Sequence, residues 1–410
     1  MKMHPSVTLV AATLAVLFGA PSVRAQFPEP LGNPTGPIEF AAGQQNARVV
    51  PFVGGLSHPW SIAFLPDGTM LVTELPGRLR IVRNGVLDPR PAWTAPPAPG
   101  PDPDDNNARV RAVAVHPQFA QNRLVYLSHV KWGERGNTLA VSRGRLEGGA
   151  LRDVEEIFVA EAWEASGNLG GRMLFGPDNT LYVTVGDRDR LCCIGRDDNS
   201  LRMKAQSLDN HVGKTLRLRD DGGVPADNPF VGRADARPEI FTYGHRNGYG
   251  LSFHPETGAL WQAEIGPLGG DEVNVLEPGG NYGWPLVSMG RNYTGTRVSE
   301  QPWFRPDMVP PQLFWVPAIS PSSIVFYTGD KFPAWKNSLL VGALTTRQLQ
   351  RVSWGNPSQE ERREILLAPL GLRVRDVAQG PDGYIYVATE PDRRPGTTDG
   401  AILRIEPAGP

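Results

Sequence analysis

The sequence predicts an all-β protein, a six-bladed β-propeller, from a repeated phrase, its spacing and its alternating strands. An apolar run, then Pro-Asp-Gly or a near variant, then a second β-rich run recurs six times. The phrases are anchored on Pro66, Pro117, Pro177, Pro255, Pro333 and Pro381. Successive anchors lie 51, 60, 78, 78 and 48 residues apart, and repeats of this length are typical of propellers and solenoids.

Each repeat has the pattern of two strands joined by a tight turn. In the third repeat, Leu181, Val183 and Val185 are apolar at every second position, which indicates a half-buried strand. The Pro-Asp-Gly pieces supply the residues that tight turns favour. Because a propeller buries its core between neighbouring blades, we expect one domain over residues 46–410.

The N-terminus has the features of a secretory signal. Lys2 precedes an apolar stretch over residues 7–20, and small residues flank Arg24 before Gln26. This predicts a signal peptide over residues 1–25 and a periplasmic or secreted mature protein. The apolar stretch is too short for a membrane span, and no later segment approaches about 20 apolar residues. The Pro- and Gly-rich residues that follow predict a flexible lead-in over residues 26–45.

The charge of the chain argues against nucleic acid as a partner, and its two cysteines cannot stabilise the fold by joining distant segments. The 41 Lys and Arg residues against 43 Asp and Glu residues give a net charge of −2 without a basic block, so nucleic acid is not an expected partner. Cys192 and Cys193 are adjacent and cannot join distant parts of the fold. In an oxidising compartment they could form a strained vicinal disulfide or remain two free thiols, and both alternatives stay open.

Two sets of polar residues are candidates for chemistry, because loops at one end of a propeller channel converge. The first set lies in the segments 243–248, 262–267, 270–274 and 279–284, which are rich in Gly and oxygen donors. These suit calcium, which accepts main-chain carbonyls, although glycines that merely turn the chain are the alternative. In the second set, alternation places Arg373 and Arg375 on one strand face, as an anion site or as two surface arginines.

These pieces, in this order, resemble the soluble pyrroloquinoline quinone (PQQ)-dependent glucose and aldose sugar dehydrogenases. The phrases that carry the resemblance are GKTLRLRDDGGVPADNPF, YGHRNGYGL, GPLGGDEVN, GGNYGWP and RVRDVAQGPDG. The likeness runs from about Leu56 to Ile405. It implies a six-bladed propeller, PQQ and calcium as cofactors, and a sugar as substrate.

The resemblance also implies a role for individual residues toward PQQ. Arg246 and Asn247 match the pair beside the reactive carbonyl of the quinone. Arg373 and Arg375 match arginines that hold its carboxylates. Asp187 matches the carboxylate that orients the catalytic base.

The resemblance implies two calcium sites. Gly266 and Pro267 match positions whose main-chain carbonyls bind the calcium that PQQ also ligates. Glu272 and the carbonyl of Tyr282 match a second, structural calcium site.

Three positions depart from the family pattern. Asn168 stands where the family has its catalytic histidine, and an amide cannot accept a proton near neutral pH. Asn107 and Arg109 stand where the family has a glutamine and a glycine. Thr345 replaces a lysine that binds the quinone. We assign the catalytic positions to Asn168, Asp187 and Arg246, and include Asn107 and Thr345 among the cofactor positions.

Two interpretations of these departures remain open. In the first, Arg109 replaces the missing lysine cation and Asp187, Glu264 or His129 acts as the base. The protein is then an exported oxidoreductase of an aldose or related hydroxy or aldehyde compound. It uses an external electron acceptor, since the sequence has no haem-binding CxxCH motif.

In the second interpretation, Arg109 fills the pocket and the family scaffold has lost its dehydrogenase activity. The protein is then a calcium-stabilised propeller that binds a carbohydrate or a protein, or a metal-dependent hydrolase of lactones or esters.

Overall fold

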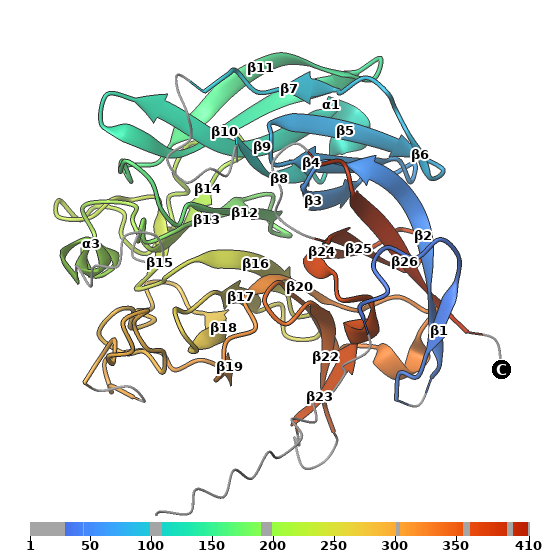
Figure 1. Ribbon diagram of the computed structural model, residues 1–410. Helices are drawn as coiled ribbons and strands as arrows, with labels where there is room; N and C mark the ends of the chain where they lie inside the picture. Colours follow the sequence, from blue (N-terminus) through green and yellow to red (C-terminus); the bar gives the residue numbers. More distant parts are fainter. Residues whose placement is uncertain are drawn as a thin grey trace, which may run out of the picture.

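The computed structural model describes residues 29–43, 45–98, 109–189, 199–300, 304–355, 361–391 and 397–408. Within these ranges nearly all regular structure is β (Figure 1), as the sequence predicts. The short helical elements are α1 (Phe119–Asn122), α3 (Asn199–Met203), η1 (Lys204–Gln206), η2 (Pro333–Trp335) and η3 (Ala368–Leu370).

The described strands form six antiparallel sheets, which are the six predicted blades. Blade 1 contains β3 (Pro59–Phe64), β4 (Met70–Glu74), β5 (Arg78–Arg83), β6 (Val86–Leu87) and β7 (Trp93–Thr94). Blade 2 contains β8 (Val110–Val115), β9 (Leu124–Gly133), β10 (Gly136–Glu147) and β11 (Ala150–Val159). Blade 3 contains β12 (Gly170–Phe175), β13 (Leu181–Val185), β14 (Lys214–Leu218) and β15 (Ile240–Tyr243).

The other three blades follow along the chain. Blade 4 contains β16 (Gly248–Phe253), β17 (Leu260–Glu264), β18 (Asp271–Leu276) and β19 (Leu313–Trp315). Blade 5 contains β20 (Pro321–Phe326), β21 (Leu339–Ala343), β22 (Gln348–Trp354) and β23 (Glu361–Leu366). Blade 6 contains β24 (Arg373–Gln379), β25 (Ile385–Glu390), β26 (Gly400–Pro407), β2 (Ala47–Leu56) and β1 (Ile38–Phe40).

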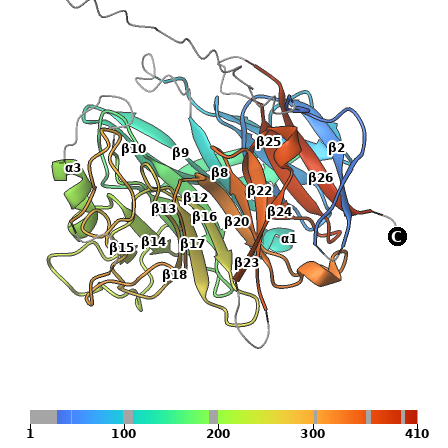
Figure 2. The same ribbon diagram turned by 60° about the horizontal axis from the view of Figure 1, so that its bottom comes forward.

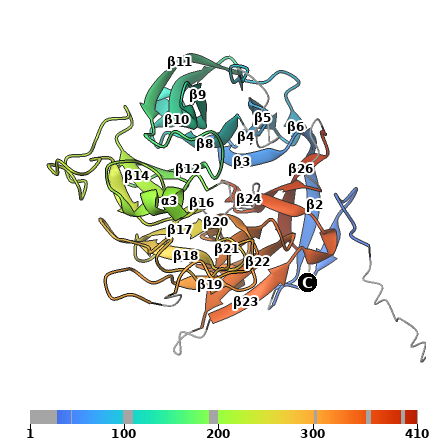
Figure 3. The ribbon, with the colours of Figure 1, turned by 60° about the vertical axis from the view of Figure 1, so that its left-hand side comes forward.

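The first strands of the blades form a closed inner ring. Each of β3, β8, β12, β16, β20 and β24 packs on the next, and β24 packs on β3. Figure 2 shows β12, β16 and β20 side by side, and Figure 3 shows the inner strands in the middle with β11, β14 and β23 at the periphery. All six anchoring prolines of the repeat lie between the first and second strands of a blade.

Both ends of the chain build blade 6, which closes the ring. β2 pairs with β26, with Val49 opposite Ile405, and β1 adds an outer strand beside β2. Part of the predicted flexible lead-in is therefore a strand. Composition alone missed it because β1 depends on pairing with β2. The predicted signal peptide lies outside the described residues. No helix of the described residues is long and apolar enough to cross a membrane.

Side chains from opposite blades meet on the ring axis. Trp60 of blade 1 and Tyr249 of blade 4 contact edge to face with ring centroids 5.6 Å apart. Arg172 of blade 3 forms a buried ion pair of 3.1 Å with Asp376 of blade 6. Its guanidinium also lies 4.7 Å from the Trp60 ring. These contacts form a plug across the axis, and we call the end at which the inner strands begin the channel mouth.

Candidate active site at the channel mouth

Strand register brings charged side chains from several blades to the channel mouth. Where an inner strand begins, the partner position on the second strand is a carboxylate in three blades. Pro59 pairs with Glu74, Gly248 with Glu264 and Arg373 with Glu390. The equivalent partner of Val110 is His129. Residues distant in sequence therefore meet at one end of the channel, as the repeat predicts.

Asn168 and Asp187 are in direct contact at this end. Asn168 Nδ2 donates to Asp187 Oδ1 over 2.9 Å. Asp187 follows β13 and is fully buried, and Asp189 N donates to the same oxygen over 3.0 Å. The Trp284 indole donates to the other oxygen, Oδ2, over 2.8 Å. The amide therefore makes the contact with Asp187 that the family resemblance implies for a catalytic histidine.

Burial changes the acidity of Asp187. Removal from water raises its pKa to about 6, against the lowering influence of the nearby Arg246 charge. Desolvation opposes the charged form of a carboxyl group, which accounts for this direction. Asp187 is consequently a carboxylate at neutral pH with a proton affinity unusual for an aspartate.

Arg246 is held on several sides. Its Nη1 donates to the carbonyls of Ile265 and Gly266 over 2.8 and 2.9 Å. Its guanidinium lies 5.4 Å from the ring of Trp284, within cation–π range. Its Nη2 is 3.6 Å from Asp189 Oδ2. Arg246 Nε is buried without a hydrogen-bond partner among the described residues.

Helix α3 reaches this cluster through Arg202, which is fully buried. Arg202 Nε and Nη2 lie 3.1 and 3.0 Å from Asp189 Oδ2, and Nη1 donates to Asn292 over 2.6 Å. The Arg202 guanidinium lies 5.4 Å from the Trp284 ring. Asp189 thus holds two guanidinium groups beside one indole.

Asn247 links the blade 3 loop to blade 4. Its Oδ1 accepts from Gly170 N over 3.2 Å, and its Nδ2 donates to Asn168 Oδ1 over 3.4 Å. The predicted catalytic residues Asn168, Asp187 and Arg246 and the predicted cofactor residue Asn247 therefore lie in one group.

The predicted arginine pair lies on the other side of the mouth, in blade 6. Arg373 Nε and Arg375 Nη2 contact Glu390 Oε1 over 3.2 and 2.5 Å, and His58 Nδ1 lies 2.9 Å from Glu390 Oε2. Simple alternation does not explain this pairing, because a bulge between Val374 and Asp376 shifts the register. Both arginines nevertheless reach one carboxylate.

The cationic neighbours determine the state of Glu390. Burial alone would raise its pKa, but the charge of Arg375 and hydrogen bonds from His58 and Arg375 lower it well below the ordinary value. Glu390 is therefore a permanent anion that offsets one of two positive charges. Arg375 Nε is buried without a hydrogen-bond partner among the described residues. An unpaired donor and a net positive charge fit a ligand that carries carboxylates.

Glu272 has surroundings that fit a cation. It is buried on β18, where burial and then the neighbouring Glu264 raise its pKa well above the ordinary value. Asn274 Nδ2 lies 3.4 Å from Glu272 Oε2, while Asn274 Oδ1 is buried without a partner among the described residues. A cavity of about 10 Å³ adjoins Glu272 and Tyr282. This volume suffices for one water-sized occupant, and hard oxygen donors suit calcium.

The other predicted calcium ligands lie in the loop between β17 and β18. Asp271 shapes this loop, since its carboxylate accepts from Gly266 N over 2.8 Å and from Ile319 N over 2.6 Å. The Gly266 carbonyl already accepts from Arg246, so a metal at this oxygen would compete with that hydrogen bond. Pro267 follows in the same loop. Within the described residues no three His, Cys, Asp or Glu side chains form a metal-ligating group.

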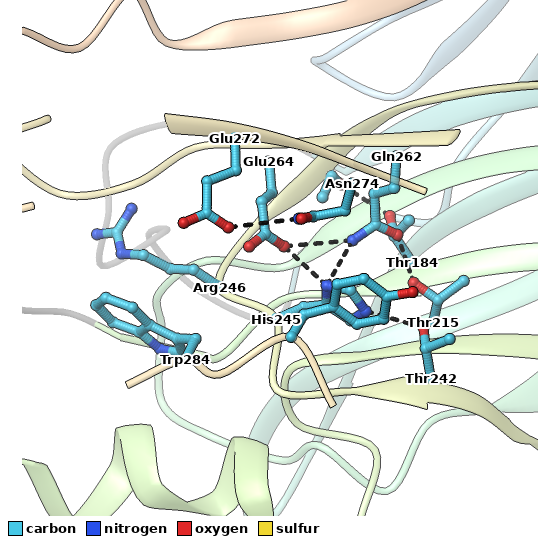
Figure 4. Close-up of polar contacts among 12 residues, drawn as sticks. Thr184, Thr215, Thr242, His245, Arg246, Gln262, Glu264, Glu272, Asn274 and Trp284 are labelled. Carbon is cyan, nitrogen blue, oxygen red and sulfur yellow. Dashed lines mark hydrogen bonds and ion pairs between the residues drawn. The ribbon is translucent and has the colours of Figure 1, made fainter. Parts of the chain in front are cut away.

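A buried polar network lies behind these residues (Figure 4). His245 Nδ1 lies 2.9 Å from Glu264 Oε2, and its Nε2 lies 2.8 Å from Thr242 Oγ1. Gln262 Nε2 lies 3.3 Å from the same Glu264 oxygen, and the Tyr282 ring stacks on His245 at 4.7 Å. Glu264 is thus engaged in a structural network, which argues against its alternative role as the base.

The remaining predicted residues are dispersed. His129 Nε2 lies 2.8 Å from Ser142 Oγ within blade 2. Arg109 Nη1 donates to the carbonyls of Ala95 and Pro96 beside blade 1. Thr345 is exposed and its hydroxyl lies 2.6 Å from that of Ser320. Asn107, Cys192 and Cys193 lie outside the described residues.

Comparison with known proteins identifies the family. Residues 56–404 match the model of the family described as Glucose / Sorbosone dehydrogenase. The chain belongs to the Glucose / Sorbosone dehydrogenase family. It is 38% identical over 382 residues to the uncharacterized protein slr1608 of Synechocystis sp., covering 91% of this chain and 90% of that protein. It is 36% identical over 361 residues to the aldose sugar dehydrogenase YliI of Escherichia coli, covering 86% and 91%.

Two further likenesses concern proteins whose names state an activity. The chain is 26% identical over 441 residues to quinoprotein glucose dehydrogenase B of Acinetobacter calcoaceticus, covering 90% and 91%. The crystal structure of the soluble aldose sugar dehydrogenase from Escherichia coli in the apo form matches with a TM-score of 0.76 at 33% identity, covering 88% of this chain and 100% of that one. The chain is therefore a sugar dehydrogenase-like oxidoreductase of this family.

Several residues of the site escaped sequence reasoning. Trp284 lies within a phrase noted for its glycines, and Glu390 ends the second strand of the sixth repeat. The rule that polar residues end the repeated strands could have found Glu390. Nothing in the sequence connects Arg202 or Asp189 with Arg246, because their pairing depends on the fold.

Proposed function

We propose that this family member is an exported, calcium-dependent quinoprotein that oxidises an aldose or a related hydroxy or aldehyde compound with PQQ. The observation that carries the proposal is the Arg373–Arg375–Glu390 cluster opposite Arg246 at one channel mouth. The name of the Acinetobacter relative supports a quinone cofactor. The predicted signal peptide supports export.

The residues present have complementary tasks in this proposal. Arg373 and Arg375 would hold carboxylates of PQQ, and Arg246 would face its reactive part. Glu272, Asn274 and the Tyr282 carbonyl would hold a structural calcium, and the carbonyls of the 266–267 loop would hold a second. When bound, PQQ supplies a two-electron acceptor for the hydride of the anomeric carbon, and the sugar becomes a lactone.

The proton of the sugar hydroxyl needs an acceptor, and Asp187 is the best placed of the three candidates. Glu264 and His129 are engaged with His245 and Ser142. Asp187 has a pKa of about 6, close to the value that suits a general base near neutral pH. The amide of Asn168 occupies Asp187 Oδ1, however. The Asn168 side chain must therefore rotate away before a substrate hydroxyl can reach that oxygen. We therefore expect slow turnover.

The test is sugar-dependent reduction of a dye by the purified mature protein, with and without PQQ and calcium. The proposal expects slow reduction that requires both. Ester or lactone hydrolysis that requires metal but no quinone would replace the proposal with the hydrolase interpretation. Tight sugar binding with no turnover of any kind would replace it with the binding-protein interpretation.

A further inference from the structure

Arg111 on β8 is a buried cation to which the proposed function gives no task. The side chain is 8% exposed. Within the described part of the chain no hydrogen bond or ion pair reaches its guanidinium, and its Nε is buried without a partner. Leaving a buried donor without a hydrogen bond is unfavourable, so the Nε of Arg111 calls for a partner that a ligand can supply.

The position of Arg111 is set by a feature common to all inner strands. Each inner strand has a register shift just after it begins, so an extra residue interrupts its pairing with the second strand. In blades 1 and 4 the extra residues are Trp60 and Tyr249, which meet on the ring axis. In blade 6 the extra residue is Arg375. Arg111 lies in the corresponding shift of blade 2, between Val110 and Val113.

The stem of Arg111 packs against blade 3. A Cβ atom added to Gly171 would lie 3.0 Å from both Cβ and Cγ of Arg111. Gly171 has a φ of +99°, so glycine is favoured there on conformational grounds and also leaves room for the arginine stem. Gly171 lies three residues after Asn168, on the side of the mouth that holds Asp187. Arg111 is thus associated with the reaction side of the mouth rather than with the Arg373–Arg375 pair.

The other arginines of the mouth are already neutralised or hydrogen-bonded. Arg373 and Arg375 contact Glu390, and Arg246 contacts Asp189 and two carbonyls. Among these described arginines, Arg111 alone has no carboxylate within ion-pair distance and no hydrogen bond to its guanidinium. A guanidinium binds a carboxylate through paired, charge-assisted hydrogen bonds.

We propose that Arg111 recognises a carboxylate of a ligand bound at the channel mouth, and that the ligand is an acidic sugar of the uronate type. The inference rests on the proposed function in placing the sugar on the Asn168 side. The alternative source of the same chemistry is a carboxylate of PQQ, and the two sources are separated by experiment.

The experiment compares wild type with Arg111→Met, Arg111→Lys and the control Arg152→Met, which removes an exposed arginine from β11 of the same blade. Each protein is titrated calorimetrically with PQQ, and then with D-glucuronate and D-glucose in the presence of PQQ and calcium. We expect Arg111→Met to weaken glucuronate binding about tenfold to a hundredfold, with glucose and PQQ binding unchanged. Arg111→Lys should retain part of the affinity, and Arg152→Met should match wild type.

Weaker PQQ binding in Arg111→Met, with glucuronate binding unchanged, would assign Arg111 to a carboxylate of the cofactor and overturn the assignment to an acidic sugar. Unchanged binding of both glucuronate and PQQ would overturn the inference. If wild type fails to bind PQQ, the proposed function fails, and titration of the calcium-loaded protein with glucuronate alone still decides the role of Arg111.

Thermal unfolding of the ligand-free proteins separates recognition from a structural role. Because Arg111 Nε is buried without a partner, Arg111→Met removes an unsatisfied donor and should leave the midpoint of unfolding at least as high as that of wild type. A lower midpoint would mean that Arg111 stabilises the fold, and would contradict the inference.

Discussion

The two sides of the channel mouth differ in how completely their charges are paired. On the blade 6 side, Glu390 joins Arg373, Arg375 and His58 in one buried cluster. On the blade 3 side, Asp187 faces the amide of Asn168, and Arg111 has no partner among the described residues. The difference fits the proposal that the half of the site expected to bind PQQ is kept while the half expected to react has changed.

Restoring an imidazole on the blade 3 side is the largest expected effect. Asn168→His places a proton acceptor beside Asp187, whose carboxylate would orient the ring. A general base contributes about 10²- to 10⁴-fold in rate, so dye reduction by the PQQ-loaded protein should rise within that range. Asn168→Gln is the matched control and should give no gain. An unchanged rate in Asn168→His, despite bound PQQ, would mean that the pocket serves another reaction.

Breaking the blade 6 cluster should cost stability. Arg375→Met leaves Glu390 buried with fewer cations, and removal of one partner of a buried ion pair costs about 3–5 kcal/mol. Urea unfolding measures the loss. The double variant Arg375→Met, Glu390→Gln should recover part of it, because the buried anion is gone and only the half-buried Arg373 then lacks its carboxylate partner. A double variant as unstable as the sum of both single changes would show that the cluster is not one unit.

Much of the fold could be predicted from the sequence, because the repeated phrase marks the hairpin between the first two strands of every blade. The arginine pair and Glu272 were also within reach, since each lies in a distinctive phrase. Contacts across the ring were not. Asp187 and Trp284 are separated by 97 residues. The lack of a partner for Arg111 Nε depends on what surrounds it in the fold, which no local pattern reveals.

The raised pKa of Asp187, on the blade 3 side, predicts how the free energy of unfolding of the protein depends on pH. The Asp187 pKa rises from an ordinary 3.8 to about 6 in the folded protein because it is buried. Between these values the folded state holds more protons than the unfolded state, so rising pH lowers the free energy of unfolding through this group. The loss is about 3 kcal/mol, fully present above pH 6. Asp187→Asn should remove this component from the stability difference measured between pH 4 and 7, and an identical profile would contradict it.

Binding of calcium at Glu272, which belongs to neither side of the mouth, should have the smallest of the effects predicted here. At a concentration about 100 times its dissociation constant, a ligand that binds only the folded state stabilises it by about 2.7 kcal/mol. Calcium should therefore raise the unfolding midpoint of wild type and have less effect on Glu272→Gln. Without calcium this variant should be at least as stable as wild type, because Glu272 is a buried acid with a raised pKa. An equal calcium response in both proteins would place the ion elsewhere.

The most direct test of the account is calorimetric titration of the calcium-loaded mature protein with PQQ, with Arg246→Ala as the comparison. The account predicts saturable binding to one site in wild type and a loss of affinity in the variant, since Arg246 lies at the mouth in the same group as Asp187 and Asn168. No binding to wild type would contradict the central claim that this channel mouth is a quinone site.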